Sequence, residues 1–167
     1  MLTTRLRPSH LDDLDFVLAA ENAPENSPFV SQWPRDRHIA ALGDPDDAHL
    51  ILERQADLKP VGYLIFQGLT EPNLSRQLRR LVVTEKGKGY GRAGVRLAKQ
   101  LAFETWGIHR LWLDVKTFNT RAQALYRSEG FVVEGTMRDC LKVGDRFESL
   151  VLMSILRPEY EQLGTTL

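Results

Sequence analysis

The sequence predicts a single α/β domain, because strand-like and helix-like segments alternate along all 167 residues. Short apolar runs indicate the strands, and apolar residues at helical spacing indicate the helices between them. No repeat, low-complexity stretch or linker interrupts this alternation. A chain of this length can bury one hydrophobic core, so we expect one domain over residues 1–167.

The N-terminal part is expected to form a strand and two helices. Residues 2–7 form the strand, and the Ser-His-Leu-Asp segment at 9–12 resembles a capping box that starts a helix through about Glu21. A loop that carries two aromatic side chains, expected to be exposed, then runs to residue 33. Pro34 opens a short helix that Gly43 ends.

Three strand-like runs and a longer helix come next. Residues 48–54 and 61–67 are joined by a polar turn, which predicts an antiparallel hairpin. Residues 74–83 form the strand that leads into a glycine-rich loop. From 91 to 105 apolar side chains recur at helical spacing, so we expect a helix with one face on the sheet.

The C-terminal part is expected to alternate again between strand and helix. Residues 111–115 predict a strand, and Asn119 is placed as the N-cap of a short helix that Gly130 stops. Two further strands are expected at residues 131–139 and 147–156, joined across the Val-Gly-Asp turn at 143–145.

The most informative segment is the loop that runs from Lys86 to Arg92 with the sequence Lys-Gly-Lys-Gly-Tyr-Gly-Arg. Its three glycines bare the backbone at the start of a helix, where unpaired N–H groups and the helix dipole favour an anion. It is not a P-loop, because no Gly-Lys-Ser/Thr closes it. Residues 89–94 match the G-x-G-x-x-G of dinucleotide-binding folds, but residues 84–88 separate them from the strand and Asp114 lies inside the next strand. An NAD-binding oxidoreductase is therefore a remote alternative.

Together with the segment that follows the next strand, this loop resembles the GCN5-related N-acetyltransferase family. That segment reads Asn119-x-x-Ala-x-x-Leu-Tyr126-x-x-x-Gly-Phe131, and the resemblance covers roughly residues 74–156. The N-terminal pattern is similar to the branch that acetylates ribosomal proteins. The resemblance implies a three-layer α/β fold: a mixed, mostly antiparallel sheet of about seven strands, splayed at the acetyl-CoA site, with helices on both faces.

The resemblance also implies which residues hold acetyl-CoA as cosubstrate. The backbone of the strand end would pair with the pantetheine arm, the loop would cradle the pyrophosphate, and Asn119 would contact the pantetheine or anchor the local geometry. Lys86 stands where the family usually has Arg or Gln, so its side chain lacks the planar fork of arginine. The implied cofactor-binding residues are Leu81, Val82, Val83, Lys86, Gly87, Lys88, Gly89, Tyr90, Gly91, Arg92, Asn119 and Tyr126.

Two residues are the candidate catalysts. Tyr126 matches the family tyrosine that lies near the sulfur and helps the thiolate to leave; the alternative is a ring packed in the core. Asp114 is the first candidate for a general base, since Gln77 stands where many relatives carry a Glu and cannot accept a proton. Four alternatives remain open: a purely structural role for a buried Asp114, another carboxylate such as Glu21 near the expected substrate entrance, a water relay, and delivery of an already neutral amine.

The acceptor is expected to be a primary amine, either of a small molecule or at a protein N-terminus. By resemblance, Glu21, Phe29 and Trp33 lie where relatives bind substrate, although core packing or a dimer contact is equally compatible with Trp33. A module that senses acyl-CoA without turnover is the main alternative to an enzyme. We expect a monomer or a homodimer.

Composition sets further limits on partners and compartment. The formal net charge of +0 gives no general attraction to nucleic acid or anionic membranes, and no segment reads as a signal peptide or a membrane span. One cysteine, Cys140, gives no intrachain disulfide, which favours the cytoplasm. No metal site is expected, because the histidines lack ligand spacing and are expected at the surface or as caps; they are His10, His38, His49 and His109.

Overall fold

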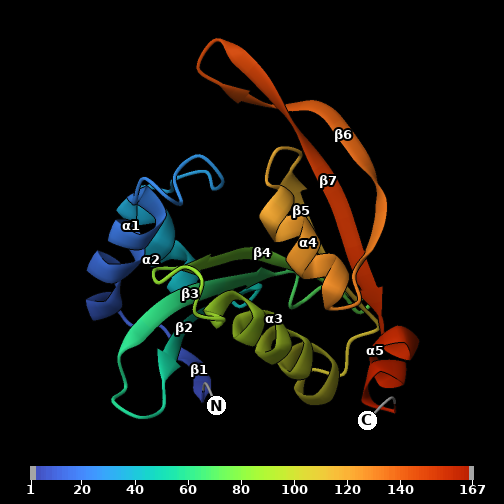
Figure 1. Ribbon diagram of the computed structural model, residues 1–167. Coiled ribbons are helices and arrows are strands. Elements are labelled where there is room, and N and C mark those ends of the chain that lie inside the picture. The colour runs from blue at the N-terminus through green and yellow to red at the C-terminus, as the bar shows by residue number, and fades with distance from the viewer. Residues whose placement is uncertain (1–2, 166–167) are drawn as a thin grey trace.

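The computed structural model describes residues 3–165 and is built on one seven-stranded sheet (Figure 1). The strand order is β1-β2-β3-β4-β5-β7-β6, and every neighbouring pair is antiparallel except β4 with β5. The predicted fold class and the expected hairpin of β2 with β3 are thereby confirmed. The strands are β1 (Thr4–Pro8), β2 (Asp47–Arg54), β3 (Pro60–Gln67), β4 (Ser75–Val83), β5 (Arg110–Lys116), β6 (Val132–Val143) and β7 (Arg146–Leu156).

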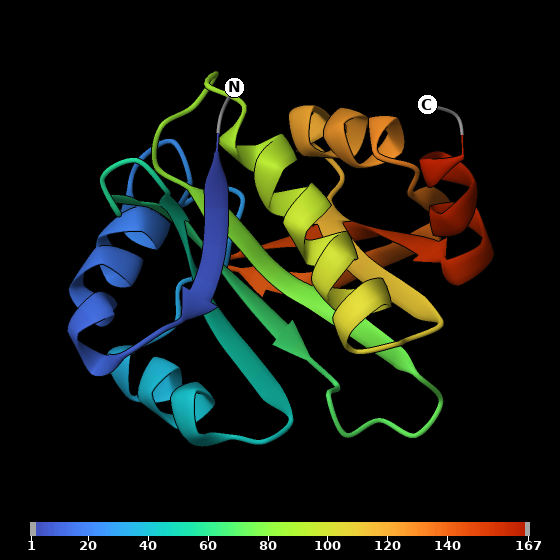
Figure 2. The ribbon, with the colours of Figure 1, turned by 90° about the horizontal axis from the view of Figure 1, so that it is seen from below.

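Helices cover both faces of the sheet, and each group buries its own hydrophobic cluster (Figure 2). On one face, α1 (Leu14–Asn22), which follows a 3₁₀ turn (Leu11–Asp13), and α2 (Arg35–Gly43) pack with side chains such as Tyr63 and Val82. The other face carries α3 (Tyr90–Gln100), its π-helical extension (Leu101–Thr105), α4 (Thr120–Ser128) and α5 (Arg157–Gly164).

The sheet separates in its middle. β4 pairs with β5 only through Ser75, Arg76 and Gln77, whereas β5 stays paired with β7 from Arg110 to Lys116. Beyond Gln77 the two parallel strands diverge, so the remainder of β4 has a ladder partner on the β3 side alone. The resulting gap lies between β4 and the layer of β5 and α4.

Several elements differ from the expected ones. The helix α5 was not predicted, and β6 extends to Val143 with two register shifts. Nearly all residues of β6 are exposed, on both sides of the register shifts. The hairpin of β6 and β7 projects from the body of the molecule (Figure 1). Leu2, the expected start of the first strand, lies outside the described residues. The assignment of the whole chain to one domain stays a prediction.

Candidate active site

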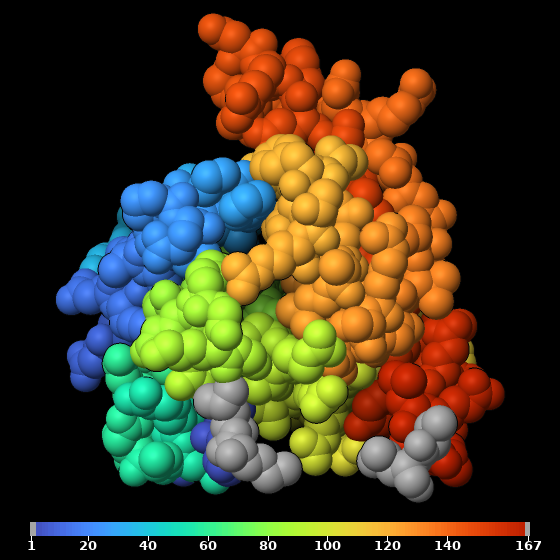
Figure 3. Space-filling model, viewed as in Figure 1, coloured from blue at the N-terminus to red at the C-terminus, as the bar shows by residue number. Residues whose placement is uncertain are grey.

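A cavity of about 930 Å³ occupies the gap where β4 and β5 separate. Its walls come from the loop after α1, from β4, the glycine-rich loop, β5 and α4, with Leu141 of β6 and Leu150 of β7. Figure 3 shows the surfaces of the glycine-rich loop (green) and α4 (light orange) meeting around a hollow. The cavity therefore brings together segments that are about 100 residues apart in the sequence, from Glu25 to Tyr126.

The glycine-rich loop adopts the backbone that its sequence predicts. Gly87 and Gly89 have φ angles of 74° and 84°, in the left-handed region, and α3 begins at the next residue, Tyr90. Gly94 lets α3 approach β4, because a Cβ there would lie 2.9 Å from Cδ1 of Leu81. The loop thus presents a helix N-terminus to the cavity, a position that favours anions.

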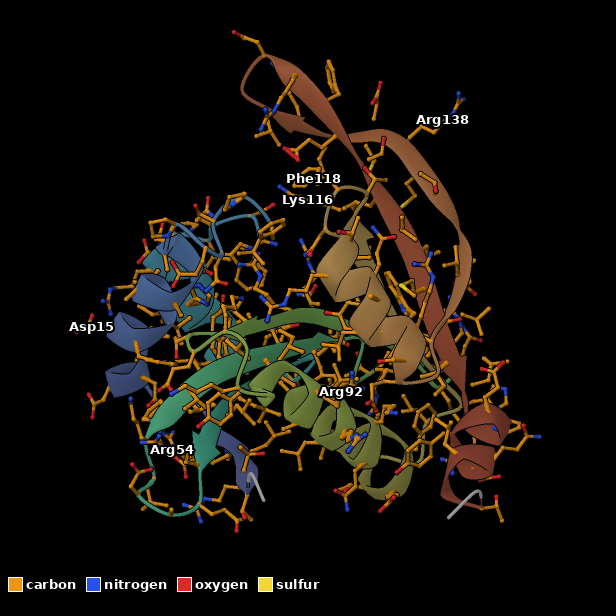
Figure 4. The ribbon with its side chains drawn as sticks, in the orientation of Figure 1. Asp15, Arg54, Arg92, Lys116, Phe118 and Arg138 are labelled. Atoms are coloured by element: carbon orange, nitrogen blue, oxygen red, sulfur yellow. The ribbon has the colours of Figure 1, made fainter. Side chains whose placement is uncertain are left out.

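The loop side chains differ in whether they line the cavity. Lys86 and Lys88 are both exposed, but only Lys86 lines the cavity, and Nζ of Lys88 lies 3.2 Å from Oε2 of Glu85. Arg92, labelled in Figure 4, also lines the cavity. Its guanidinium is paired with Glu129 at the end of α4. Of these three cations only Lys86 has no ion pair with another described residue.

Arg121, in the first turn of α4, is a cavity residue that the sequence reasoning missed. Burial lowers the pKa of Lys86, and the positive charge of Arg121 lowers it further. Two cations from opposite walls therefore repel one another across the cavity, and an anion bound between them would relieve that repulsion. The only sequence signal was the position of Arg121, two residues after the cap Asn119.

The end of β4 offers backbone groups instead of charges. Residues Leu81–Val83 line the cavity on the side where β5 has diverged. Arg79 has no partner in the β3 ladder, since Ile65 pairs with Arg80 and Phe66 with Leu78, so Arg79 forms a β-bulge. The Asn26 side chain donates to the carbonyl of Val83 at 3.2 Å. An extended ligand can use the other groups of this edge.

Tyr126 and Asp114 face the same cavity, with Asn119 at the start of the same helix as Tyr126. Burial raises the pKa of Tyr126 to about 12, and the negative charge of Asp114 adds to this effect. Burial also raises the pKa of Asp114, while the nearby Arg79 opposes the rise. Gln77 donates to Oδ2 of Asp114 at 3.3 Å. Asn119 is the expected N-cap, because its side chain accepts from Ala122 N at 3.2 Å.

Of the three expected acceptor residues, only Phe29 lies on the cavity wall. Phe29 is 38% exposed, and its ring centroid is 5.9 Å from that of Phe118. The Nζ of Lys116 donates to the carbonyl of Pro28 at 3.0 Å. Figure 4 shows Lys116 and Phe118 together near the end of β5. These contacts attach the loop after α1 to the far side of the gap.

Glu21 and Trp33 lie behind the wall, where they are 0% and 3% exposed. The expectation that Trp33 is an exposed aromatic was wrong: its ring is packed against the guanidinium groups of Arg80 and Arg37, at 4.6 and 3.9 Å. Glu21 accepts hydrogen bonds from Tyr63 and Arg80, both at 2.8 Å. Neither residue reaches the cavity, so direct contact with an acceptor is no longer proposed for them.

Two histidines complete this buried cluster, which corrects their expected place at the surface. His38 Nε2 lies 3.1 Å from Oε1 of Glu21, and His38 Nδ1 lies 3.1 Å from Nε2 of His49. His49 Nδ1 in turn lies 2.8 Å from Oγ of Ser9. Burial would raise the pKa of Glu21, but hydrogen bonds from His38 and Tyr63 outweigh it and hold that pKa below its usual range.

Residues 3–165 contain no group of three or more His, Cys, Asp and Glu side chains with the geometry to hold a metal ion. No helix within that part of the chain is both long and apolar enough to cross a membrane.

The similar proteins of known sequence or structure described next are all N-acetyltransferases. A spermidine N(1)-acetyltransferase of Vibrio cholerae is 31% identical over 166 residues, which cover 93% of this chain and 94% of that protein. The spermidine N(1)-acetyltransferase of Escherichia coli is 23% identical over 95% of this chain and 88% of its own length. A crystal structure of the Vibrio cholerae spermidine N-acetyltransferase with CoA and spermine has the same fold, with a TM-score of 0.85 at 20% identity over 95% of this chain and 98% of that one.

The family model described as the acetyltransferase (GNAT) family matches residues 14–131, which include both the glycine-rich loop and Tyr126. The finer resemblance to the ribosomal-protein branch stays a prediction. Since the matched segment is well over half of the sequence, this chain belongs to the acetyltransferase (GNAT) family.

Proposed function

We propose that the protein transfers the acetyl group of acetyl-CoA directly to a primary amine while both substrates occupy the cavity between β4 and β5. Family membership makes it an acetyl-CoA-dependent N-acetyltransferase; the direct transfer, the residue roles and the acceptor are the proposal. The observation that carries it is that Asp114 and Tyr126 line one cavity together with the glycine-rich loop.

The cavity has the groups that acetyl-CoA requires. Lys86, Arg121 and the N-terminus of α3 are suited to its phosphates. The open edge of β4 is suited to the amide groups of the pantetheine arm, which have the same hydrogen-bonding pattern as a peptide. The expected roles of Leu81–Val83, of Asn119 and of the loop backbone belong to this proposal.

Asp114 is the proposed general base. An ammonium group has no free lone pair, so Asp114 accepts its proton before the nitrogen attacks the thioester carbonyl. The carbon–nitrogen bond then forms and the carbon–sulfur bond breaks. The amide nitrogen gives up its second proton, which restores the phenol of Tyr126 after that phenol has protonated the thiolate. The burial that raises the pKa of Asp114 makes it a stronger base than an exposed aspartate.

Tyr126 is the proposed general acid. With a pKa raised to about 12, its phenol stays protonated at neutral pH and can donate a proton to the departing thiolate. Backbone N–H groups near the bulge at Arg79 are the candidate donors to the carbonyl oxygen as negative charge develops there.

The acceptor is proposed to be a small-molecule amine, with a protein N-terminus as the alternative. The named relatives are spermidine acetyltransferases, which supports a small amine. The cytoplasmic location, the absence of nucleic-acid and membrane partners, and a monomeric or homodimeric state are predictions from the sequence.

The test measures thiol release from acetyl-CoA with a panel of amines and N-terminal peptides, for the wild type and for Tyr126→Phe. We expect acceptor-dependent release whose kcat falls by about 100-fold or more in Tyr126→Phe, since a general acid contributes that much. Tyr160→Phe is the matched control, because Tyr160 lies on α5 outside the cavity wall.

Equal activity of Tyr126→Phe and Tyr160→Phe would remove Tyr126 from the mechanism. Tight binding of acetyl-CoA in calorimetry with no release in the presence of any amine would instead favour the sensor alternative. Binding of NAD in place of CoA would favour the oxidoreductase.

A further inference from the structure

We propose that the acceptor carries an anionic group, a carboxylate, on the same molecule as the amine that is acetylated, and that the guanidinium of Arg79 binds it. The inference rests on the proposed acetyl transfer and names the chemical class of its acceptor. It follows from which charged side chains of the cavity wall have a salt bridge and which have none.

The wall is richer in positive than in negative side chains. Half of its six cations are already neutralised within the described residues: Arg80 by Glu21, Arg92 by Glu129 and Lys116 by Glu148. Glu85, one of three wall carboxylates, is paired with Lys59 and Lys88. The wall residues left without a salt bridge are the cations Arg79, Lys86 and Arg121 and the carboxylates Glu25 and Asp114.

These unpaired groups lie at two ends of the cavity. The charges of Arg121 and Glu25 both shift the pKa of Lys86, so these three residues form one group beside the glycine-rich loop. The charge of Asp114 shifts the pKa of Arg79, which lies earlier on β4. At about 3.3 Å per strand residue, Arg79 is roughly 13 Å from Val83, where the strand ends and the loop begins.

The phosphates of acetyl-CoA account for the first group and leave the second without a ligand. A cosubstrate with its phosphates at the loop has its acetyl end farther along the gap, towards Asp114 and Arg79. The acetyl group is uncharged. An anion that pairs with Arg79 must therefore come from the second substrate.

The surroundings of Arg79 suit such an anion. Arg79 is half-buried, and within residues 3–165 its guanidinium has no hydrogen bond or salt bridge. Burial lowers the pKa of Arg79, the negative charge of Asp114 opposes this effect, and the positive charges of Arg80 and Arg37 add to it. A desolvated guanidinium with free donors binds a carboxylate through two parallel hydrogen bonds.

The same charges disfavour a polyamine. Spermidine carries several ammonium groups, and each group that enters the cavity needs a carboxylate or water. Asp114 is the one unpaired wall carboxylate near Arg79 among the described residues, and its proposed task is to take a proton from the reacting amine. A second ammonium would face Arg79. We therefore expect this chain to differ in acceptor from the spermidine acetyltransferases that it resembles.

The experiment uses pairs of acceptors that differ by one carboxylate, and each kcat/KM is expressed per concentration of neutral amine, because the amide member of a pair has a less basic amine. Alanine is compared with alaninamide and glutamate with glutamine, and spermidine serves as the polycation. The dipeptide amides Glu-Ala and Gln-Ala separate an acidic protein N-terminus from a free amino acid as the source of the carboxylate. For the wild type we expect kcat/KM to be higher for the more anionic member of at least one pair, and lowest for spermidine.

Arg79→Gln should reduce this preference on the order of 10- to 100-fold, the cost of a hydrogen-bonded charge pair. Arg79→Lys should restore part of it, because a point charge remains without the fork. Arg138→Gln is the control: Arg138 is exposed on β6 and is not one of the residues that line the cavity (Figure 4).

Three results would overturn the inference while leaving acetyl transfer intact. The first is that spermidine or neutral amines are the best acceptors. The second is that Arg79→Gln leaves the ratio of kcat/KM values within each pair unchanged, and the third is that it shifts the pH profile equally for all acceptors. The last result would mean that Arg79 acts only on the pKa of Asp114. Absence of transfer to every amine would be different, because it contradicts the proposed function itself.

Discussion

At the scale of single residues, the proposed base Asp114 and the proposed acid Tyr126 share one buried environment. Burial raises the pKa of Asp114 and of Tyr126, which moves the carboxylate towards stronger basicity and keeps the phenol protonated. The same burial makes Asp114 a stronger base and Tyr126 a weaker acid than their exposed counterparts. The positive charge of Arg79 limits the rise at Asp114. In the proposed mechanism, an acceptor carboxylate bound to Arg79 would therefore raise the pKa of the base further.

Replacing Asp114 by Asn should change the shape of the pH profile as well as the rate. Without a base, the enzyme depends on acceptor that is already neutral, and this fraction grows tenfold per pH unit below the pKa of the amine. We expect kcat/KM of the variant to be reduced by about 100-fold at neutral pH and to rise with a slope of one on a logarithmic plot. A variant profile parallel to that of the wild type would assign the base to water or to another residue.

Local motifs and the family resemblance that they carry led to residues that line the cavity, namely the glycine-rich loop, Asn119 and Tyr126. Their roles stay predictions. Arg79 and Arg121 stand in no such motif. Glu21 and Trp33 were expected near the acceptor, yet the burial of an acidic or aromatic side chain depends on the packing of distant elements.

At the scale of elements, one buried carboxylate connects most of the N-terminal half. Glu21 of α1 meets His38 of α2, Tyr63 of β3 and Arg80 of β4, and the chain of contacts continues to His49 of β2. The network lies directly behind the wall at Arg80. It therefore couples the packing of α1 and α2 to the position of β4.

The network should make stability fall in mild acid. Burial, together with the positive charge of His38, lowers the pKa of His49 from 6.5 to about 4. Between those values the unfolded chain binds a proton that the folded chain does not, so stability falls as pH drops from 6.5 to about 4. This group alone contributes a loss of roughly 3 kcal/mol.

Urea unfolding across this pH range tests the network. His49→Gln should flatten the dependence, although its stability at neutral pH will be lower. His109→Gln, at an exposed position, is the control and should follow the wild type. The role assigned to His49 would be refuted by an unchanged slope in a folded His49→Gln variant.

Elements with a clear periodic pattern were predicted well, and those whose ends depend on packing were not. All seven strands were expected from apolar runs, but the length of β6 was not, since its residues are largely exposed and lack an apolar pattern. The helix α5 has two sequence features that are typical of a helix start. They are a proline in its first turn and Glu159, which accepts from Leu156 N at 2.9 Å.

At the scale of the whole molecule, two halves meet along a short seam. The strands β1–β4 form one half of the sheet and β5, β7 and β6 the other, with three residue pairs of parallel ladder between them. Lys86 belongs to the first half and Arg121 to the second. A ligand with phosphates between these cations therefore joins the halves.

Binding of acetyl-CoA should raise the melting temperature of the protein, because a ligand that binds only the folded state stabilises it. We expect this shift to be much smaller in the double variant Lys86→Met, Arg121→Met, and to weaken with added salt in the wild type. Lys88→Met is the matched control, since Lys88 lies in the same loop but pairs with Glu85. Equal shifts in both variants, measured by calorimetry, would contradict the assignment of the phosphate site.

The separation of β4 from β5 has a cost that bears on engineering. Beyond Gln77, β4 and β5 do not form the hydrogen bonds that a fully paired sheet would form. The region around the cavity is therefore less stable than a fully paired sheet would be. A substitution selected only for heat resistance can gain by drawing the strands together. The backbone groups of β4 and β5 would then bond to one another, and the variant would be more stable but would lack the cavity that binds the substrate.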